Sequence, residues 1–122
     1  MDSDCRYDLK GFSADLGLPI EDIADLFSDF IKEINSEILK AKAFLSEKNL
    51  AQLGLINHNI KGISANYRIQ DIHEETLVIS NALKNGDLKS IESQFDNFFI
   101  VSDNAVQEII RYFDRNGMII EK

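Results

Sequence analysis

Proline and glycine, the residues that most often interrupt regular secondary structure, are scarce in this chain. It has one proline and six glycines among 122 residues. An all-β domain of this length would need many turns, and these two residues are the main punctuation of turns. Leucine, isoleucine, alanine, glutamate and lysine recur throughout instead. The sequence therefore predicts an all-α fold.

Apolar residues recur every three or four positions along four segments, which is the spacing of a buried stripe on an α-helix. The first segment, about 19–45, starts with Pro19, whose fixed φ suits the first turn of a helix. The second covers about 50–66 and follows Asn49 and Gln52, which resemble a capping pair. These features predict two amphipathic helices separated by a short polar break.

The other two segments also carry start and stop signals. Asp71 and Glu74 repeat the capping arrangement before the third segment, and the Asn-Gly pair that ends with Gly86 provides a left-handed stop. Asp87 is then expected to cap the fourth and longest segment, which a second Asn-Gly pair ends at Gly117. The sequence therefore predicts four helices with short connections between them.

Connections of only a few residues leave no room for crossovers, so an antiparallel up-down-up-down four-helix bundle is the simplest packing. Residues 1–18 are mixed in character, and a short N-terminal helix that caps one end of the bundle is expected there. The chain has no internal repeat and no flexible linker, and its length is that of one domain. We therefore expect a single domain over residues 1–122.

The charge and the apolar pattern exclude several classes of partner. The 21 acidic and 13 basic residues give a formal charge of -8, and no basic stripe offsets it, which argues against binding to a nucleic acid. No apolar run approaches the length of a membrane span or of a signal-peptide core. Cys5 is the single cysteine and cannot form an internal disulfide. A reducing cytoplasm is the expected location.

The second predicted helix carries a histidine away from its apolar stripe. That stripe lies within roughly 80° of arc, and His58 lies roughly 180° from its middle. The residues of the stripe are Leu53, Ile56, Ile60, Ile63 and Tyr67. A lone histidine in a helix is usually a core residue with a buried partner, but this position points away from the core.

The neighbours of His58 on its own helix face are nearly all small. Gly54, Gly62 and Ala65 lie one or two turns away, together with Lys61. Each glycine inside a helix costs about 1 kcal/mol relative to alanine, so two glycines beside one exposed imidazole need a compensating reason. We interpret them as a way to let another protein approach the ring closely.

Two further residues fit a docking face around an anion. Leu55, also outside the core stripe, gives this surface an apolar patch. The ammonium of Lys61 lies one turn from His58, where it can donate charge-assisted hydrogen bonds to a phosphoryl group held on the ring. A neutral imidazole is a good nucleophile near physiological pH because its ordinary pKa is about 6.5. The residues therefore predict that His58 accepts a phosphoryl group.

At residues 58–62 the chain reads HNIKG, followed by Ser64, Ala65 and Asn66. This run resembles the H-x-x-K-G-x-S/A-x-N signature of histidine-containing phosphotransfer (HPt) domains. The likeness extends to the four-helix plan over about residues 18–115, and it places the motif on the exposed face of the second of four helices.

The resemblance implies a phosphorelay carrier. His58 would attack the aspartyl phosphate of a response-regulator receiver domain, or accept the group from a sensor kinase, and later pass it to another receiver. It also implies that Nε2 faces solvent, that no cofactor or metal is bound, and that the Mg²⁺ used in transfer belongs to the receiver. The chain has no ATP-binding motif, so it is expected not to be an enzyme by itself. Family members of this type are mostly monomers.

Two departures from the family pattern leave alternatives open. Relatives commonly carry glycine where this chain has Arg68, so either the turn is strained by a positive φ or Arg68 supplies a second cation near the site. Many relatives place glutamine or glutamate on the third helix opposite the histidine, where this chain has Ser80. A serine hydroxyl can orient Nδ1 of His58 but has a shorter reach.

Other readings of the sequence compete with the carrier. One is an adaptor that binds receivers without transferring phosphate, and another is a bundle that uses His58 to ligate a metal or haem, for which no second ligand converges. His73, beside Glu74 and Glu75, is expected to belong to a solvated polar face and not to a metal site, because ligands at adjacent helical positions do not converge. Cys5 has no evident base nearby that could make it a nucleophile. Met1 favours a free-standing protein, although the same residues could end a hybrid sensor kinase.

Overall fold

The computed structural model describes residues 5–118 and 120. Within these residues the chain forms helices and no strand, which confirms the all-α prediction. The helices are α1 (Leu9–Leu16), α2 (Ile20–Ser46), α3 (Leu50–Asn66), α4 (Gln70–Asn85) and α5 (Leu88–Arg115). None of them is both long enough and apolar enough to cross a membrane. The expectation of a free-standing protein was based on Met1, which lies outside the described residues.

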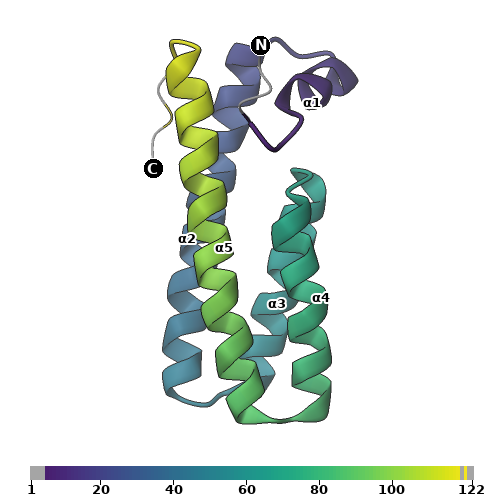
Figure 1. The fold of residues 1–122 in the computed structure, drawn as a ribbon, viewed down its shortest axis with the longest axis vertical. Helices are drawn as coiled ribbons and strands as arrows, with labels where there is room; N and C mark the ends of the chain where they lie inside the picture. Colours follow the sequence, from purple (N-terminus) through teal and green to yellow (C-terminus); the bar gives the residue numbers. More distant parts are fainter. Residues whose placement is uncertain (1–4, 119, 121–122) are drawn as a thin grey trace.

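The four longer helices lie side by side (Figure 1). Helix α3 packs against α2 and α4, and α5 packs against the same two helices. Because α3 and α4 are shorter than α2 and α5, the long pair extends beyond the short pair at one end, and α1 lies over the end of α3 and α4 (Figure 1). The short N-terminal helix predicted from the sequence is therefore present.

Aromatic rings from four elements meet beneath α1. Phe27 on α2 is fully buried, and its ring centroid lies 5.4 Å from Phe12 on α1, 5.9 Å from Phe30 and 6.0 Å from Phe113 on α5. The ring of Tyr67, at the end of α3, lies 5.3 Å from Phe27. Edge-to-face and tilted contacts of this kind add to the free energy gained by burying the rings. This cluster therefore ties α1 and the end of α3 to the two long helices.

The helix limits follow the local signals closely in most places. Helix α3 has the limits predicted for it, and Asn49 Oδ1 accepts a hydrogen bond from Gln52 N at 3.2 Å. The left-handed stops at Gly86 and Gly117 are confirmed, with φ of 69° and 77°. Pro19 is the N-cap of α2 and not a residue of its first turn. Cap and stop signals act over a few residues, which is why the sequence alone reveals them.

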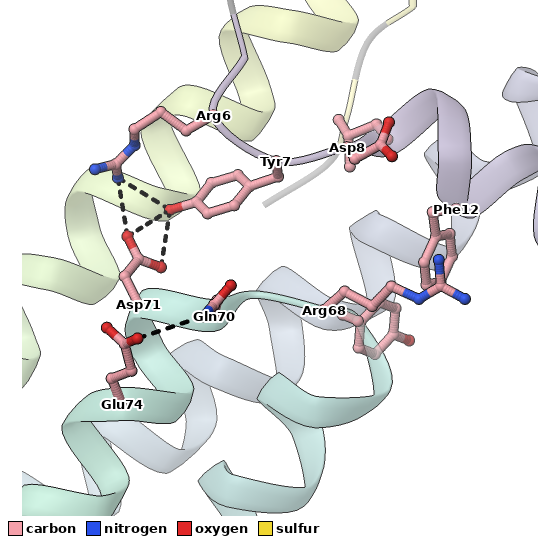
Figure 2. A pocket seen from close by; sticks show the side chains of 10 residues that line it. Arg6, Tyr7, Asp8, Phe12, Arg68, Gln70, Asp71 and Glu74 are labelled. Atoms are coloured by element: carbon pink, nitrogen blue, oxygen red, sulfur yellow. Dashed lines mark hydrogen bonds and ion pairs between the residues drawn. The ribbon is translucent and has the colours of Figure 1, made fainter.

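The predicted start of α4 was wrong. Asp71 does not cap the helix; Ile69 is the N-cap, and Asp71 lies inside the first turn. The Asp71 carboxylate instead binds the N-terminal segment (residues 5–8). Tyr7 Oη donates a hydrogen bond to Asp71 Oδ2 at 2.9 Å, and Arg6 Nη2 lies 3.0 Å from the same oxygen (Figure 2). A tertiary contact therefore replaces the local cap that the sequence suggested.

The same contacts fasten the N-terminal segment to the bundle. Arg6 Nε lies 3.2 Å from Glu108 Oε1 on α5, so one arginine bridges α4 and α5. Burial, together with the hydrogen bond to Asp71, raises the pKa of Tyr7 well above its usual range. Tyr7 therefore keeps its proton at physiological pH and remains a hydrogen-bond donor to Asp71.

The connection after α2 contains a residue in the left-handed region that is not glycine. Lys48 has φ of 55°, and Asn49 N donates to Phe44 O at 2.9 Å to close the end of the helix. A side chain with a Cβ is strained in this conformation, by roughly 1–2 kcal/mol. Lys48 is exposed. Its side chain therefore offers little packing in return for the strain.

Lys48→Gly is expected to raise the free energy of unfolding by about 0.5–1 kcal/mol, because glycine adopts the left-handed conformation without strain but is more flexible when unfolded. Urea unfolding followed by circular dichroism measures the change. Lys48→Ala is the matched control: it removes the same charge and keeps the Cβ, so it should give no gain. A glycine variant that is less stable than the alanine variant would contradict this account.

Candidate functional site

Helix α3 presents His58 to solvent and its apolar stripe to the core. Leu53, Ile56 and Ile60 are at most 3% exposed, whereas His58 is exposed. The other two residues of the predicted stripe, Ile63 and Tyr67, are half-buried and pack against the core. The helical periodicity therefore gave the right orientation for the histidine.

The two glycines of α3 are not required by packing. A Cβ added at Gly54 or at Gly62 would meet no atom within 4 Å. Both positions face open space on the same side of the helix as His58, as does Ala65, which is exposed. Leu55 is 58% exposed. Small residues and one exposed leucine therefore lie around the histidine, and no contact among the described residues requires the two glycines.

A groove between α2 and α3, which we call the α2–α3 groove, borders His58 on one side. His58 and Gly62 line it from α3, and Lys32, Glu33 and Glu37 line it from α2. Glu37 is 7% exposed, and its two oxygens accept hydrogen bonds from Asn59 Nδ2 and Lys40 Nζ, each at 3.1 Å. This buried carboxylate helps to join the two helices below the groove.

A second groove, the α3–α4 groove, borders His58 on the other side. Its lining consists of Gly54, Asn57, His58, Lys61, Ser80, Leu83 and Lys84. Asn57 Nδ2 donates to Ser80 Oγ at 2.9 Å and to the backbone oxygen of Thr76 at 3.0 Å. These bonds join α3 to α4 at the level of the histidine.

The structure brings most of the predicted site residues together. Lys61, Gly54 and Ser80 share the α3–α4 groove with His58, and Gly62 shares the α2–α3 groove with it. The sequence suggested that Ser80 could orient Nδ1 of His58. The bond that Ser80 makes in the structure is instead to Asn57. Ser80 therefore lies in the expected place with a different partner.

Arg68 lies away from the histidine. Its guanidinium lies 5.3 Å from the ring centre of Phe12 (Figure 2). Its Nη1 is also 2.6 Å from Asp15 Oδ2, so α1 holds the side chain. Arg68 lines a separate pocket beneath the N-terminal segment (residues 5–8), whereas neither groove beside His58 includes it. The idea that Arg68 supplies a second cation at the site was wrong. Its φ of 59° supports the other reading, a left-handed turn kept without glycine.

Sequence reasoning missed three residues beside His58. Lys84 follows Ser80 by one turn of α4, so the helical spacing could have revealed it once Ser80 was assigned. Asn57 and Lys32 left no such signal, because their places depend on how α3 packs against its two neighbours. Three lysines from three helices therefore line the two grooves that flank one exposed histidine.

The structure gives no support for a metal site or for a functional role of His73 or Cys5 within the described residues. Within residues 5–118 and 120, no three His, Cys, Asp or Glu side chains are grouped so that they could hold a metal ion. The expectation that His73 lies on a solvated polar face was wrong. The residue is half-buried, and its Nε2 is buried and neither donates nor accepts a hydrogen bond among the described residues. Burial raises the pKa of the Cys5 thiol above its ordinary value, which makes the nucleophilic thiolate less available.

Comparison with known proteins identifies no relative of this chain. No family model matches the chain, and no curated protein or solved structure matches it significantly. The functional inference therefore depends on the motif at residues 58–62 and on the two grooves beside it.

Proposed function

We propose that this protein is a phosphoryl carrier of the histidine-containing phosphotransfer type. His58 accepts a phosphoryl group from the aspartate of a receiver domain, or from a sensor kinase, and passes it to another receiver. The observation that carries the proposal is the placement of His58, exposed near the middle of α3 between two grooves to which three helices contribute lysines. The HNIKG run at residues 58–62 supports the same assignment.

The proposal includes an antiparallel up-down-up-down arrangement of α2 to α5, with α1 as a cap. The connections 47–49, 67–69 and 86–87 are too short for a crossover between distant helix ends. The packing of α3 and α5 against both α2 and α4 fits a closed ring of four neighbours. Such a bundle holds the middle of α3 rigid, which keeps the nucleophile in one position.

The transfer step needs only a positioned nucleophile on this chain. The lone pair of His58 Nε2 attacks the phosphorus of the aspartyl phosphate, and a P–N bond forms while the P–O bond to the aspartate breaks. The electron pair of that bond leaves with the receiver carboxylate, and the ring proton stays on Nδ1. Mg²⁺ held by the receiver offsets the charge on the phosphoryl oxygens. The reverse step passes the group to the next receiver.

The surroundings of His58 suit this chemistry. Gly54, Gly62 and Ala65 leave room for the surface of a receiver to reach the ring, and the exposed side chain of Leu55 offers an apolar contact. Lys61 is exposed one turn from the histidine and can donate charge-assisted hydrogen bonds to the phosphoryl oxygens. The proposal assigns this chain no bound cofactor and no kinase activity, and places it in the cytoplasm as a monomer.

One observation favours a second candidate. The hydroxyl of Ser80 is bonded to Asn57, so the structure shows no residue of α4 that orients the imidazole. An adaptor that binds receiver domains without carrying phosphate would need no such residue. The two candidates differ in one measurable property, since only the carrier has a phosphorylated form.

Lys61→Ala tests the role of the cation. We expect phosphoryl transfer from a phosphorylated receiver to slow by about 10- to 100-fold, which corresponds to the loss of one charge-assisted hydrogen bond, without change in the circular dichroism spectrum. The initial rate of appearance of acid-labile phosphate on the carrier measures the effect. Lys89→Ala on α5 is the matched control, because Lys89 is exposed and lines neither groove. Equal rates for the two variants would contradict the role of Lys61.

A further inference from the structure

A pocket lies between the N-terminal segment (residues 5–8) and the start of α4, and we call it the N-terminal pocket. Its walls are the N-terminal segment and α1 on one side and residues 67–74 on the other (Figure 2). Its volume is about 430 Å³, which is within the range of sites that hold small molecules. No residue of its lining belongs to either groove beside His58. The pocket is therefore separate from the site proposed for phosphoryl transfer.

Part of the lining is hydrocarbon that is already packed in place. Leu9 and Phe12 of α1 are 3% and 6% exposed, and Tyr7 is buried as well. The ring of Tyr67 lies nearly parallel to that of Phe12, with 6.3 Å between the two ring centroids. A preformed wall of this kind offers dispersion contacts to a hydrocarbon chain without a cost for ordering the wall. A ligand that fits the pocket therefore has an apolar portion.

The pocket also has a carboxylate near each end. Figure 2 shows Asp8 and Glu74 on opposite sides of it, with Tyr7 and Gln70 between them. Asp8 Oδ1 accepts a hydrogen bond from Gly11 N at 2.9 Å, and Asp8 Oδ2 accepts none within residues 5–118 and 120. Glu74 accepts only a long bond of 3.4 Å from Gln70 Nε2 within the same residues. Both carboxylates therefore have oxygens available to a ligand that enters from solvent.

The other charged groups of the lining are already engaged in ion pairs. Arg6 Nη2 lies 3.0 Å from Asp71 Oδ2, and Arg6 Nε lies 3.2 Å from Glu108 Oε1. Arg68 Nη1 lies 2.6 Å from Asp15 Oδ2. An anion would have to compete with these carboxylates for either guanidinium. Among the described residues that line the pocket, the charges left without an ion pair are both negative.

The charge of the whole region has the same sign. The lining contains two guanidiniums and three carboxylates, and Asp15 and Glu108, which bind the guanidiniums from outside, bring the carboxylates to five. Lys10, two residues after Asp8, brings the cations only to three. Burial is the main reason that the pKa of each tyrosine in the lining lies above its usual value, and nearby carboxylates raise both further. The pocket therefore favours a cationic ligand over an anionic one.

We propose that the N-terminal pocket binds a linear aliphatic diamine or polyamine. The amines of such a molecule are protonated at physiological pH, because the ordinary pKa of an alkylamine such as the lysine side chain is about 10.4. One ammonium donates hydrogen bonds to Asp8 and another to Glu74, and the methylene chain between them lies against the apolar wall. This inference goes beyond the carrier function and does not depend on it, because it uses no residue beside His58.

A bound diamine links two segments that are distant in the sequence. Asp8 is the N-cap of α1 and Glu74 belongs to α4, so the ligand adds a bridge beside the hydrogen bond between Tyr7 and Asp71. A ligand that binds the folded chain and not the unfolded chain raises the free energy of unfolding by mass action. The midpoint of thermal unfolding should therefore rise with the concentration of the diamine.

A series of terminal diamines, from diaminopropane to diaminooctane, tests the pocket on the intact protein. Two of the three tyrosines, Tyr7 and Tyr67, line it, so tyrosine fluorescence reports its occupancy and calorimetry gives the affinity. In about 150 mM salt, which screens attraction to the surface as a whole, we expect one-to-one binding that is tightest at one chain length. The best diamine should bind about fivefold more tightly than butylamine, which has one ammonium. Butanediol and inorganic phosphate should leave the fluorescence unchanged.

Asp8→Asn and Glu74→Gln should each weaken binding of the best diamine by about fivefold and remove the preference for its length. Asparagine is a good N-cap, so Asp8→Asn keeps the start of α1. The matched controls are Asp87→Asn at the N-cap of α5 and Glu47→Gln at the C-cap of α2, both at the end of the bundle away from α1 (Figure 1). Each control removes one negative charge outside the pocket and should change the affinity by less than about twofold.

An optimum in chain length that is lost in both pocket variants and kept in both controls would support the site. Equal losses in the pocket and control variants would show attraction to the acidic surface as a whole, and would overturn the proposal. A fluorescence change with phosphate and none with any diamine would make this an anion site, and would overturn it too. A protein that binds the diamine but takes no phosphoryl group from receivers would keep the pocket and lose the carrier function.

Discussion

His58→Gln is expected to abolish phosphoryl uptake completely and to leave the free energy of unfolding within about 0.5 kcal/mol of the wild type. Glutamine cannot act as a nucleophile, whereas it is a good helix former and fits an exposed helical position. His58 is exposed and makes no hydrogen bond to another described residue, so little packing is lost. The measurement is the amount of acid-labile phosphate on each protein after incubation with a phosphorylated receiver and Mg²⁺.

His73→Gln is the matched control for this experiment. His73 is the only other histidine in the chain, and it is half-buried in α4 and lines neither groove beside His58. The control variant should accept phosphate at the rate of the wild type. Binding of a receiver should survive in both variants, because the docking face of α3 is kept. Phosphate that persists in His58→Gln would show that another residue is the acceptor.

Phe27→Ala is expected to have the largest effect on stability, a loss of about 3–5 kcal/mol in the free energy of unfolding. Its side chain is 0% exposed and its ring contacts four other rings, so the substitution leaves a cavity that the long helices cannot close. Urea unfolding measures the loss. Leu39→Ala on the same helix is the control, because Leu39 is 70% exposed and should change the stability by less than about 0.5 kcal/mol.

The same substitution tests how the fold supports the site. Tyr67 ends α3 and packs on Phe27 and on Phe30, whose ring centroid lies 5.1 Å away, so the cluster anchors the end of the helix that carries His58. We expect Phe27→Ala to loosen α1 and the end of α3 first. A loss of less than about 1 kcal/mol would contradict the central place that the structure gives to this cluster.

Local signals explain why much of the fold could be predicted from the sequence. The apolar spacing, the cap at Asn49 and the stops at Gly86 and Gly117 each act within one helix or one turn, and each has its predicted effect. The start of α4 could not be predicted in this way, because Asp71 bonds to Tyr7, which lies 64 residues earlier in the chain. Contacts between distant segments override a local cap without leaving a local pattern.

The same distinction between local and distant contacts explains which parts of the candidate site could be predicted from the sequence. His58, Lys61, Gly54 and Gly62 lie on one helix, so the pitch of an α-helix is enough to place them on one face. The bond between Asn57 and Ser80 joins two helices and depends on their relative register, which no spacing within α3 reveals.

Arg68 shows what sequence reasoning lacks at the end of α3. The departure from glycine is visible in the sequence, and a left-handed turn could be inferred from it. The partner of the side chain could not, because Asp15 lies 53 residues earlier on α1. The structure therefore assigns Arg68 to the contact between α1 and the turn after α3.

The intact mass of the protein after mixing with a phosphorylated receiver domain and Mg²⁺ tests the central claim most directly. The account predicts the addition of one phosphoryl group that is lost in acid and that fragmentation places on His58. Receivers that bind the protein but leave it without any phosphorylated species would contradict the carrier and would identify the protein as an adaptor.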